Sequence, residues 1–364
     1  MFKKSMMLTV SAFILAIFLI FIIQYFQFLL TPLSKTKPIH YFFEPGSSVH
    51  RLVDDLQARG FIKHSNFFFL LAYWKGATNK LKTGEYLLVP GTTPNQLLNQ
   101  MLAGNVVLHR FTIVEGWTFQ QLMTALNASP YIKHQLNQVA SKQILTVLGF
   151  PTHDPEGLFF PATYYFSLGE EDTDVLKRSY QLLEKKLNQQ WQMRDSNLPY
   201  KTPYDALIAA SLVEKETALM KERPMIAGVV ARRLAKGMPL QIDASVIYGL
   251  GNNYAGKLTI DDLRQDTRYN TYVHRGLPPT PIAIASLMSI DAVLHPDRSE
   301  NLYFVAKRDG SHQFSSNLVQ HNVAVLTYQC KRYPRVKTRI NHCRQPLWYL
   351  SNALGDLVCR SGGR

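Results

Sequence analysis

The stretch Ala206–Gly249, ALIAASLVEKETALMKERPMIAGVVARRLAKGMPLQIDASVIYG, decides how the rest of the chain is interpreted. It begins with an apolar helical run, residues 206–213, that continues without a break into Glu214-Lys215-Glu216-Thr217. Side chains two positions apart on a helix point about 200° away from each other, so Glu214 and Glu216 cannot share one face. We expect at most one of them to enter a cleft, while the other is solvated or paired.

A glutamate on a rigid, largely apolar helix can keep its carboxyl group protonated near neutral pH and act as a general acid. The same residues also fit a plain helix end with a Glu-Lys-Glu turn at the surface. The rest of the sequence has to distinguish these two interpretations.

The composition describes a folded protein with room for two domains. Of its 364 residues, 46% are hydrophobic and 18% are charged, and the net charge is +14. The tail after Tyr328 is strongly basic and contains one acid, Asp356, against Lys331, Arg332, Arg335, Lys337, Arg339, Arg344, Arg360 and Arg364. Such a charge suits an anionic lipid surface or an acidic polymer. Because no nucleic-acid motif is present, we expect no nucleic-acid partner.

The N-terminus predicts a membrane anchor. No charged residue lies between Leu8 and Leu30, and at ~1.5 Å per residue this run can cross a hydrocarbon core of ~30 Å. It lacks the short apolar core and small-residue cleavage site of a signal peptide. We therefore expect a short cytoplasmic N-terminus (1–7), a transmembrane helix (8–30) and a Pro/Lys/Ser linker (31–38). A single span followed by a large domain favours placement of that domain outside the cytosol.

The cysteines Cys330, Cys343 and Cys359 all lie in the basic tail. Their odd number leaves at least one unpaired in an oxidising compartment, unless it links to another chain.

Residues 39–104 predict a compact α+β module. A strand pattern at Ile39–Phe43 precedes a helical pattern at Val49–Arg59, which stops at Gly60. A second helix over 66–75, a strand over 84–89 and a third helix ending at Gly104 complete the module.

The remainder predicts a larger α+β domain with a loop-rich cleft. It contains a strand over 107–114, an aromatic loop at 154–161, and helices over 172–191, 204–219 and 224–236. Residues 240–322 are rich in Pro, Gly, Asn and Tyr without regular periodicity, which favours a shaped cleft.

Several motifs for other chemistries are incomplete. Gly251–Lys257 has the G-x-x-x-x-G-K spacing of a phosphate loop, but Leu258 stands where the magnesium-binding hydroxyl is required. The histidines are scattered without ligand spacing, so we expect no metal site and no cofactor. A Gly-x-Ser-x-Gly elbow is also lacking, which argues against a serine acyl-transfer site.

Three polar segments fit a saccharide-binding cleft: QIDAS at 241–245, YNTY at 269–272, and HQFS at 312–315 followed by His321-Asn322. Amide, carboxylate and tyrosine groups on proline-stiffened loops are suited to sugar hydroxyls and acetamido groups. Each segment alone also fits an ordinary ordered loop.

Taken in order, LVEKET, PLQIDASVIYG, YNTY, GLPPTPI and HQFSSN…HN are similar to the endolytic murein transglycosylase (YceG-like) family. Residues 39–108 resemble the LysM-like domain of that family, and residues 109–328 resemble its catalytic domain. EGLFFPATYYF, at 156–166, resembles its aromatic loop. The resemblance leaves the basic extension, 329–364, unexplained.

The resemblance implies a single-pass inner-membrane lyase whose catalytic domain lies in the periplasm. It would cut peptidoglycan strands internally between N-acetylmuramic acid and N-acetylglucosamine, without water, and leave 1,6-anhydro ends. One glutamate would act as acid and then as base, because the two proton transfers are sequential. Cell-wall synthases and the elongation or division machinery are partners that the family suggests.

The family's catalytic glutamate aligns with Glu216, and Glu214 is the less favoured catalyst. Glu214 is also a candidate for substrate binding. The positions that align with the family's cleft are candidates for holding sugars and orienting Glu216: Gln241, Asp243, Tyr248, Asn270, Tyr272, His321 and Asn322.

Two alternatives remain. A membrane-anchored peptidoglycan-binding scaffold would hold glycan without cutting it, and a hydrolase would use Asp243 as a partner carboxylate and leave reducing ends. The chain also departs from the family pattern at Ile284-Ala285-Ser286, where Asn-Pro-Gly is usual, and at Ala162, where Asp is usual.

Overall fold

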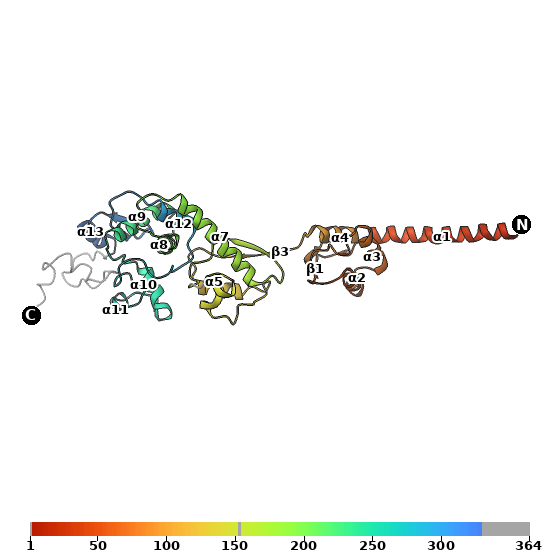
Figure 1. Cartoon of the computed structure of the whole chain (residues 1–364), viewed down its shortest axis with the longest axis horizontal. Coiled ribbons are helices and arrows are strands. Elements are labelled where there is room, and N and C mark those ends of the chain that lie inside the picture. Colours follow the sequence, from red (N-terminus) through yellow and green to blue (C-terminus); the bar gives the residue numbers. More distant parts are fainter. Residues whose placement is uncertain (1, 152–153, 330–364) are drawn as a thin grey trace, which may run out of the picture. The chain divides into compact units, whose positions relative to one another are not determined.

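The computed structural model describes residues 2–151 and 154–329 and is mixed α+β, with a long apolar helix at the N-terminus (Figure 1). The chain divides into two compact units. The first comprises Met1–Arg110 and Tyr165–Glu170, and the second comprises Phe111–Tyr164 and Glu171–Arg364. The basic extension and its three cysteines lie outside the described residues, apart from Gln329.

The first unit is a small helical layer around one strand pair. Its elements are α1 (Phe2–Leu30), β1 (Ile39–Phe43), α2 (Val49–Ala58), α3 (Ser65–Trp74), β2 (Gly84–Leu88), α4 (Pro94–Ala103) and the first residues of β3 (Leu108–Thr112). β1 and β2 pair antiparallel, with Ile39 opposite Leu88. Side-chain oxygens of Ser48 and Thr93 accept the free backbone N–H groups at the starts of α2 and α4. The strands and helices expected over residues 39–104 are therefore confirmed.

The end of α1 belongs to the core of this unit. Tyr25 and Phe28 are buried together with residues of α2, α3 and α4. The segment expected to be a linker is packed as well, because Leu33 and Ser34 are buried and the Leu33 N–H donates to the Thr92 carbonyl at 2.7 Å. α1 therefore runs directly into a folded module.

The second unit carries the remaining elements: α5 (Phe119–Asn127), α6 (Ile144–Val147), β4 (Thr163–Ser167), α7 (Asp172–Gln192), α8 (Pro203–Glu216), α9 (Arg223–Ala235), α10 (Asp243–Leu250), α11 (Ile260–Arg264), α12 (Leu287–Leu294), β5 (Tyr303–Ala306), β6 (His312–Ser315) and α13 (Leu318–Tyr328). Short 3₁₀ turns lie at Ser141–Gln143, Met220–Glu222 and Gly251–Asn253. β3 pairs with β4, and β5 pairs antiparallel with β6. The chain passes between the units within β3 and β4.

Helix α8 forms the centre of the second unit. Thr202 and Asp205 form a capping box at its start, and Pro203 occupies the first helical position, where a missing N–H costs nothing. Every residue from Ala206 to Val213 is buried, against α7, α9 and α12 among others. A helix that is apolar all round must be enclosed in this way. The helix ends at Glu216, earlier than the expected 219, because Thr217 adopts extended backbone angles.

Candidate active site

Glu216 lies where the buried helix α8 ends, at the border of two hollows in the second unit. The first pocket has a volume of about 680 Å³. Its polar lining residues are Glu216, Arg233, Gln241, Asp243, Tyr254, Lys257, Tyr272, His312, His321 and Gln329. The second pocket, of about 940 Å³, is lined by residues that include Glu115, Trp117, Lys215, Glu216, Arg223 and Met288. Glu216 thus borders both pockets.

Burial raises the pKa of Glu216 to about 8, and the nearby negative charge of Asp243 raises it in the same direction. A carboxyl group surrounded by protein loses the water that stabilises its charged form, so the neutral acid is favoured. The side chain nevertheless keeps partial access to solvent. At neutral pH, Glu216 is therefore a protonated acid that faces open space.

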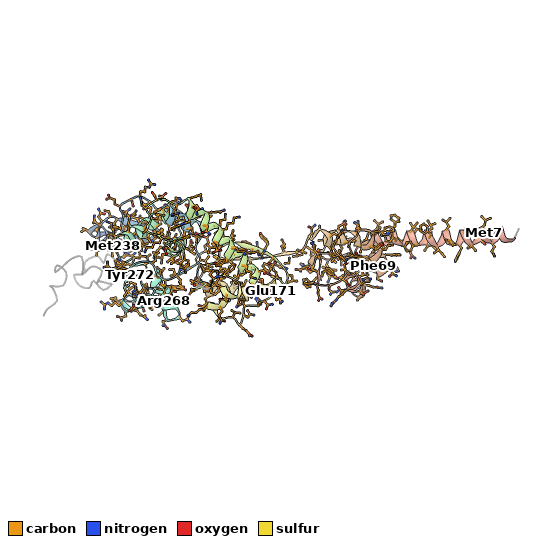
Figure 2. All side chains as sticks on the ribbon, in the orientation of Figure 1. Met7, Phe69, Glu171, Met238, Arg268 and Tyr272 are labelled. Carbon is orange, nitrogen blue, oxygen red and sulfur yellow. The ribbon has the colours of Figure 1, made fainter. Side chains whose placement is uncertain are left out.

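Asp243 and Tyr272 form a hydrogen-bonded pair in the first pocket. Asp243 is the first residue of α10, and the Tyr272 hydroxyl donates to its Oδ1 at 2.5 Å (Tyr272 is labelled in Figure 2). Burial raises the pKa of Asp243, whereas the hydrogen bond from Tyr272 lowers it. The two residues were both expected in the cleft, and the structure brings them together beside Glu216.

Gln241 has a left-handed backbone with φ of 55°, a region that side chains with a Cβ rarely adopt. Its N–H donates to the Thr271 carbonyl at 3.1 Å, and its Oε1 accepts a hydrogen bond from Arg233 Nη1 at 3.1 Å. The surrounding contacts therefore hold a strained residue on the pocket wall. Such strain is concentrated at functional sites.

Arg233, on α9, organises the opposite wall. Its guanidinium group donates to the carbonyls of Pro239, Leu240 and Leu302, and lies 4.9 Å from the centre of the Tyr303 ring. Tyr303 stacks in turn on His321 at 5.1 Å. Burial, followed by the charge of Arg233, lowers the pKa of His321 to about 4, so this imidazole is neutral at neutral pH.

Two residues of this wall were not among the expected site residues. Arg233 is a cation in the last turn of α9, where positive charge is common, so its position in the sequence does not mark it as a site residue. His312 occupies the polar HQFS segment, and its Nδ1 lies 2.7 Å from Glu222 Oε2 while its N–H donates to Glu222 Oε1. The polarity of its segment was the available signal for His312; Arg233 carried none.

Glu214 is held in a buried ion pair on the other face of α8. Its Oε1 accepts from Arg223 Nη2 at 3.0 Å, and its Oε2 accepts from the Ser286 N–H at 2.9 Å and the Ser286 hydroxyl at 2.6 Å. Arg223 Nη1 also donates to the Ser286 hydroxyl oxygen. Glu214 borders the second pocket only. Glu214 is therefore paired, which is one of the two states expected for the second glutamate. The expectation that at most one of the two enters a cleft is not met, because Glu214 and Glu216 both border the second pocket.

Three further expected residues do not line the first pocket. Asn270 is fully buried; its Nδ2 donates to the carbonyls of Leu263 and Gln265, and its Oδ1 accepts from the Tyr272 N–H. It therefore shapes the loop that presents Tyr272. Asn322 is buried on α13, and its Oδ1 has no hydrogen-bond partner within residues 2–151 and 154–329. The third, Tyr248, donates its hydroxyl to Glu156 Oε2 at 3.0 Å.

Sequence comparison places this arrangement among known proteins. The profile of the YceG-like family matches residues 42–327. The chain belongs to the YceG-like family. A Bacillus subtilis protein named endolytic murein transglycosylase is 31% identical over 328 residues, which cover 84% of this chain and 89% of that relative. A Streptococcus pneumoniae protein of the same name is 30% identical over 311 residues, 76% of this chain but 56% of that longer relative.

A crystal structure of a YceG-like protein from Listeria monocytogenes is 28% identical and superimposes with a TM-score of 0.49, covering 79% of this chain and 99% of that chain.

Ser286, in the Ile284-Ala285-Ser286 run, links α8 to α12. Its hydroxyl joins the Glu214–Arg223 pair, and its oxygen also accepts from the Ser289 N–H at the start of α12. Ala162 borders the second pocket, and its carbonyl accepts from the Ile113 N–H at 3.0 Å.

The YceG-like fold also encloses a carboxyl group that the sequence did not single out. Glu156 is buried in the aromatic loop, where it accepts hydrogen bonds from the Phe119 N–H at 2.9 Å and from Tyr248. Burial raises its pKa to about 7, although both hydrogen bonds oppose this. The side chain ties the loop to the start of α5 and to α10.

Within residues 2–151 and 154–329, no group of three or more His, Cys, Asp or Glu side chains is placed to hold a metal ion.

Proposed function

We propose that this protein is an endolytic murein transglycosylase, a lyase that cleaves peptidoglycan strands between N-acetylmuramic acid and N-acetylglucosamine. The observation that carries the proposal is Glu216, a glutamate at the end of a buried helix that borders two pockets and has a pKa raised to about 8. The names of the Bacillus and Streptococcus relatives support the same activity.

In the first step, the protonated Glu216 donates its proton to the glycosidic oxygen as the bond between that oxygen and C1 of the muramoyl residue breaks. A raised pKa supplies this proton at neutral pH. In the second step, the resulting carboxylate accepts the proton of the muramoyl C6 hydroxyl group while the C6 oxygen bonds to C1. The product is a 1,6-anhydro ring, and Glu216 regains its acid form without consuming water.

The two pockets support cleavage within a strand. An enzyme that cuts internally has to hold sugars on both sides of the scissile bond, and Glu216 borders a hollow on each side. In the first pocket, Gln241, Asp243, Tyr272 and the neutral His321 offer hydrogen-bond donors and acceptors for sugar hydroxyl and acetamido groups. In the second pocket, Trp117 offers an aromatic surface for a sugar ring.

The buried ion pair argues against Glu214 as the catalyst. Both of its carboxylate oxygens accept hydrogen bonds from Arg223 and Ser286, so they are occupied by partners within the protein. We assign Glu214 the role of holding the end of α8, so that Glu216 stays in place. The buried residues Asn270 and Asn322 are assigned supporting roles, and Tyr248 is assigned the role of holding Glu156.

The helix α1 is long and apolar enough, over Met6–Leu30, to cross a membrane. We propose that it anchors the protein in the inner membrane by a single span, with both units on the periplasmic side and the first unit acting as the LysM-like module. Peptidoglycan strands near the membrane are then the substrate. Cell-wall synthases and the elongation or division machinery are the protein partners that this location suggests.

Product analysis tests this function. Peptidoglycan is digested with the full chain in detergent, because removal of residues 1–38 would delete Tyr25, Phe28 and Leu33 from the core of the first unit. Mass spectrometry should find anhydromuramoyl ends from the intact protein and none from the Glu216→Gln variant. Reducing ends would instead indicate a hydrolase that uses Asp243. Binding of glycan without any product would favour the scaffold alternative.

A further inference from the structure

Helix α3 of the first unit is apolar on every side, yet part of it faces outward. Residues 67–74, FFFLLAYW, contain no charged side chain. Phe67, Phe68 and Leu71 are buried in the module, but Tyr73 and Trp74 are 66% and 70% exposed. A helix that is apolar all round is normally enclosed by protein or by lipid. The exposed aromatic side therefore requires an explanation outside the module.

Phe67 and Trp74 of α3 contact the anchor helix. The rings of Phe21 and Phe67 are 5.4 Å apart, and Tyr25 lies 5.7 Å from Phe67 and 6.0 Å from Trp74. Figure 1 shows α3 beside the C-terminal end of α1, and Figure 2 labels Phe69 on α3 and Met7 near the far end of α1. The position of α3 is thus fixed relative to the apolar run of α1.

The length of α1 places this contact at the membrane. A hydrocarbon core of ~30 Å needs about 20 helical residues. The apolar run begins at Met6, so even a span that begins there extends to about Tyr25. Phe21 and Tyr25 then lie in the outer part of the bilayer, and the side chains that touch them, Phe67 and Trp74, lie at the same depth.

We infer that α3 is embedded in the lipid–water interface beside α1, with Tyr73 and Trp74 as its interfacial anchors. Tryptophan and tyrosine favour this layer because their rings are apolar and their N–H and O–H groups can remain hydrated. The flanking chain is basic: residues 56–84 contain Arg59, Lys63, Lys75, Lys80 and Lys82 and no acid. These cations suit the headgroups of anionic lipids.

This inference rests on the proposed membrane anchoring and extends it. The first unit is held against the bilayer surface at two points, the span of α1 and the interfacial helix α3. The whole first unit is therefore held at the membrane surface, since α1, residues 31–34 and α3 share one core.

Depth-dependent quenching of tryptophan fluorescence tests the inference. The full chain is reconstituted into vesicles of phosphatidylethanolamine and phosphatidylglycerol, part of which carry bromine at a shallow position on the acyl chain. We expect the Trp74→Phe variant to lose most of the bromine-dependent quenching seen in the wild-type protein. The matched variant Trp191→Phe, on α7 of the second unit, should keep it.

Flotation of the vesicles separates this inference from the anchoring on which it rests. Protein that fails to float with vesicles would overturn the anchoring and the inference together. Protein that floats, but whose Trp74 emission is quenched by aqueous iodide and not by brominated lipid, would overturn the inference alone. Shielding of Trp74 from both quenchers would indicate burial in a protein contact and would also overturn it.

Discussion

Asp243 and Glu216 line one pocket, where burial raises the pKa of Glu216 to about 8 and the charge of Asp243 raises it in the same direction. Burial raises the pKa of Asp243, and the Tyr272 hydroxyl, which donates to its Oδ1 at 2.5 Å, opposes that rise. Asp243 is thus a second buried carboxyl group held beside Glu216. The activity should therefore depend on pH through the pKa of Glu216, and Asp243 is the residue whose charge shifts that pKa.

The first prediction concerns the alkaline limb of the pH profile. If protonated Glu216 is required, kcat/KM should fall as the pH rises through about 8. The Asp243→Asn variant removes the charge that raises this pKa, so the midpoint of the alkaline limb should move to lower pH. Product release from purified glycan strands, measured from pH 5 to about 10, checks the shift. An unchanged midpoint in Asp243→Asn would mean that another group titrates.

The second prediction is that Gln substitutions at the two glutamates of α8 have opposite effects: one abolishes cleavage and the other lowers stability. Glu216→Gln removes a carboxyl group that is unfavourable to ionise, so the free energy of unfolding should be kept while cleavage is lost. Glu214→Gln leaves the buried guanidinium of Arg223 without its charge partner and should cost about 3 kcal/mol. Because both carboxylate oxygens of Glu214 are engaged by Arg223 and Ser286, the variant should retain cleavage at temperatures where it stays folded.

Chemical denaturation of both variants, beside an activity assay at low temperature, provides the measurement. A stable Glu214→Gln protein without cleavage would reassign the catalyst to Glu214.

The third prediction uses the strained backbone of Gln241. Both Gln241→Gly and Gln241→Ala remove the amide group that accepts from Arg233, but only glycine adopts a φ of 55° without steric cost. The glycine variant should therefore be about 1 kcal/mol more stable than the alanine variant. Both should lose activity to a similar extent if the amide positions substrate. Equal stabilities would show that the backbone relaxes when the side chain is removed.

The sequence predicts local features of this chain better than its long-range pairs. The helix that carries Glu216 follows from apolar periodicity, and the angle between positions two apart separates Glu216 from Glu214. The pattern leaves open whether Glu214 is solvated or paired, and the structure shows the pair with Arg223. The hydrogen bond between Glu156 and Tyr248 joins residues far apart in the sequence, so no local sequence pattern predicts it. The left-handed backbone of Gln241 is not predictable from the sequence either, because such conformations are expected at glycine.

The segment that follows the anchor helix is packed against the first unit. Residues 31–38 contain proline, lysine and serine, and their composition predicts a linker. The structure instead buries Leu33 and Ser34 and binds them to the 89–92 turn by backbone hydrogen bonds. The one residue that indicates packing is the apolar Leu33, and the average composition of the segment does not show it.

The last prediction concerns the buried carboxyl group of Glu156 and the dependence of stability on pH. Its folded-state pKa of about 7 lies above the usual glutamate value of 4.5, so the folded protein binds the proton more tightly than the unfolded chain does. Stability should therefore be greatest below about pH 4.5 for this group and should fall as the pH rises to about 7, by about 3 kcal/mol in total. Glu156→Gln keeps a neutral amide at the Phe119 N–H and the Tyr248 hydroxyl, so it should remove this decline. Urea unfolding of both proteins between pH 4.5 and about 8 gives the comparison, and parallel curves for the two would show that Glu156 stays charged in the folded protein.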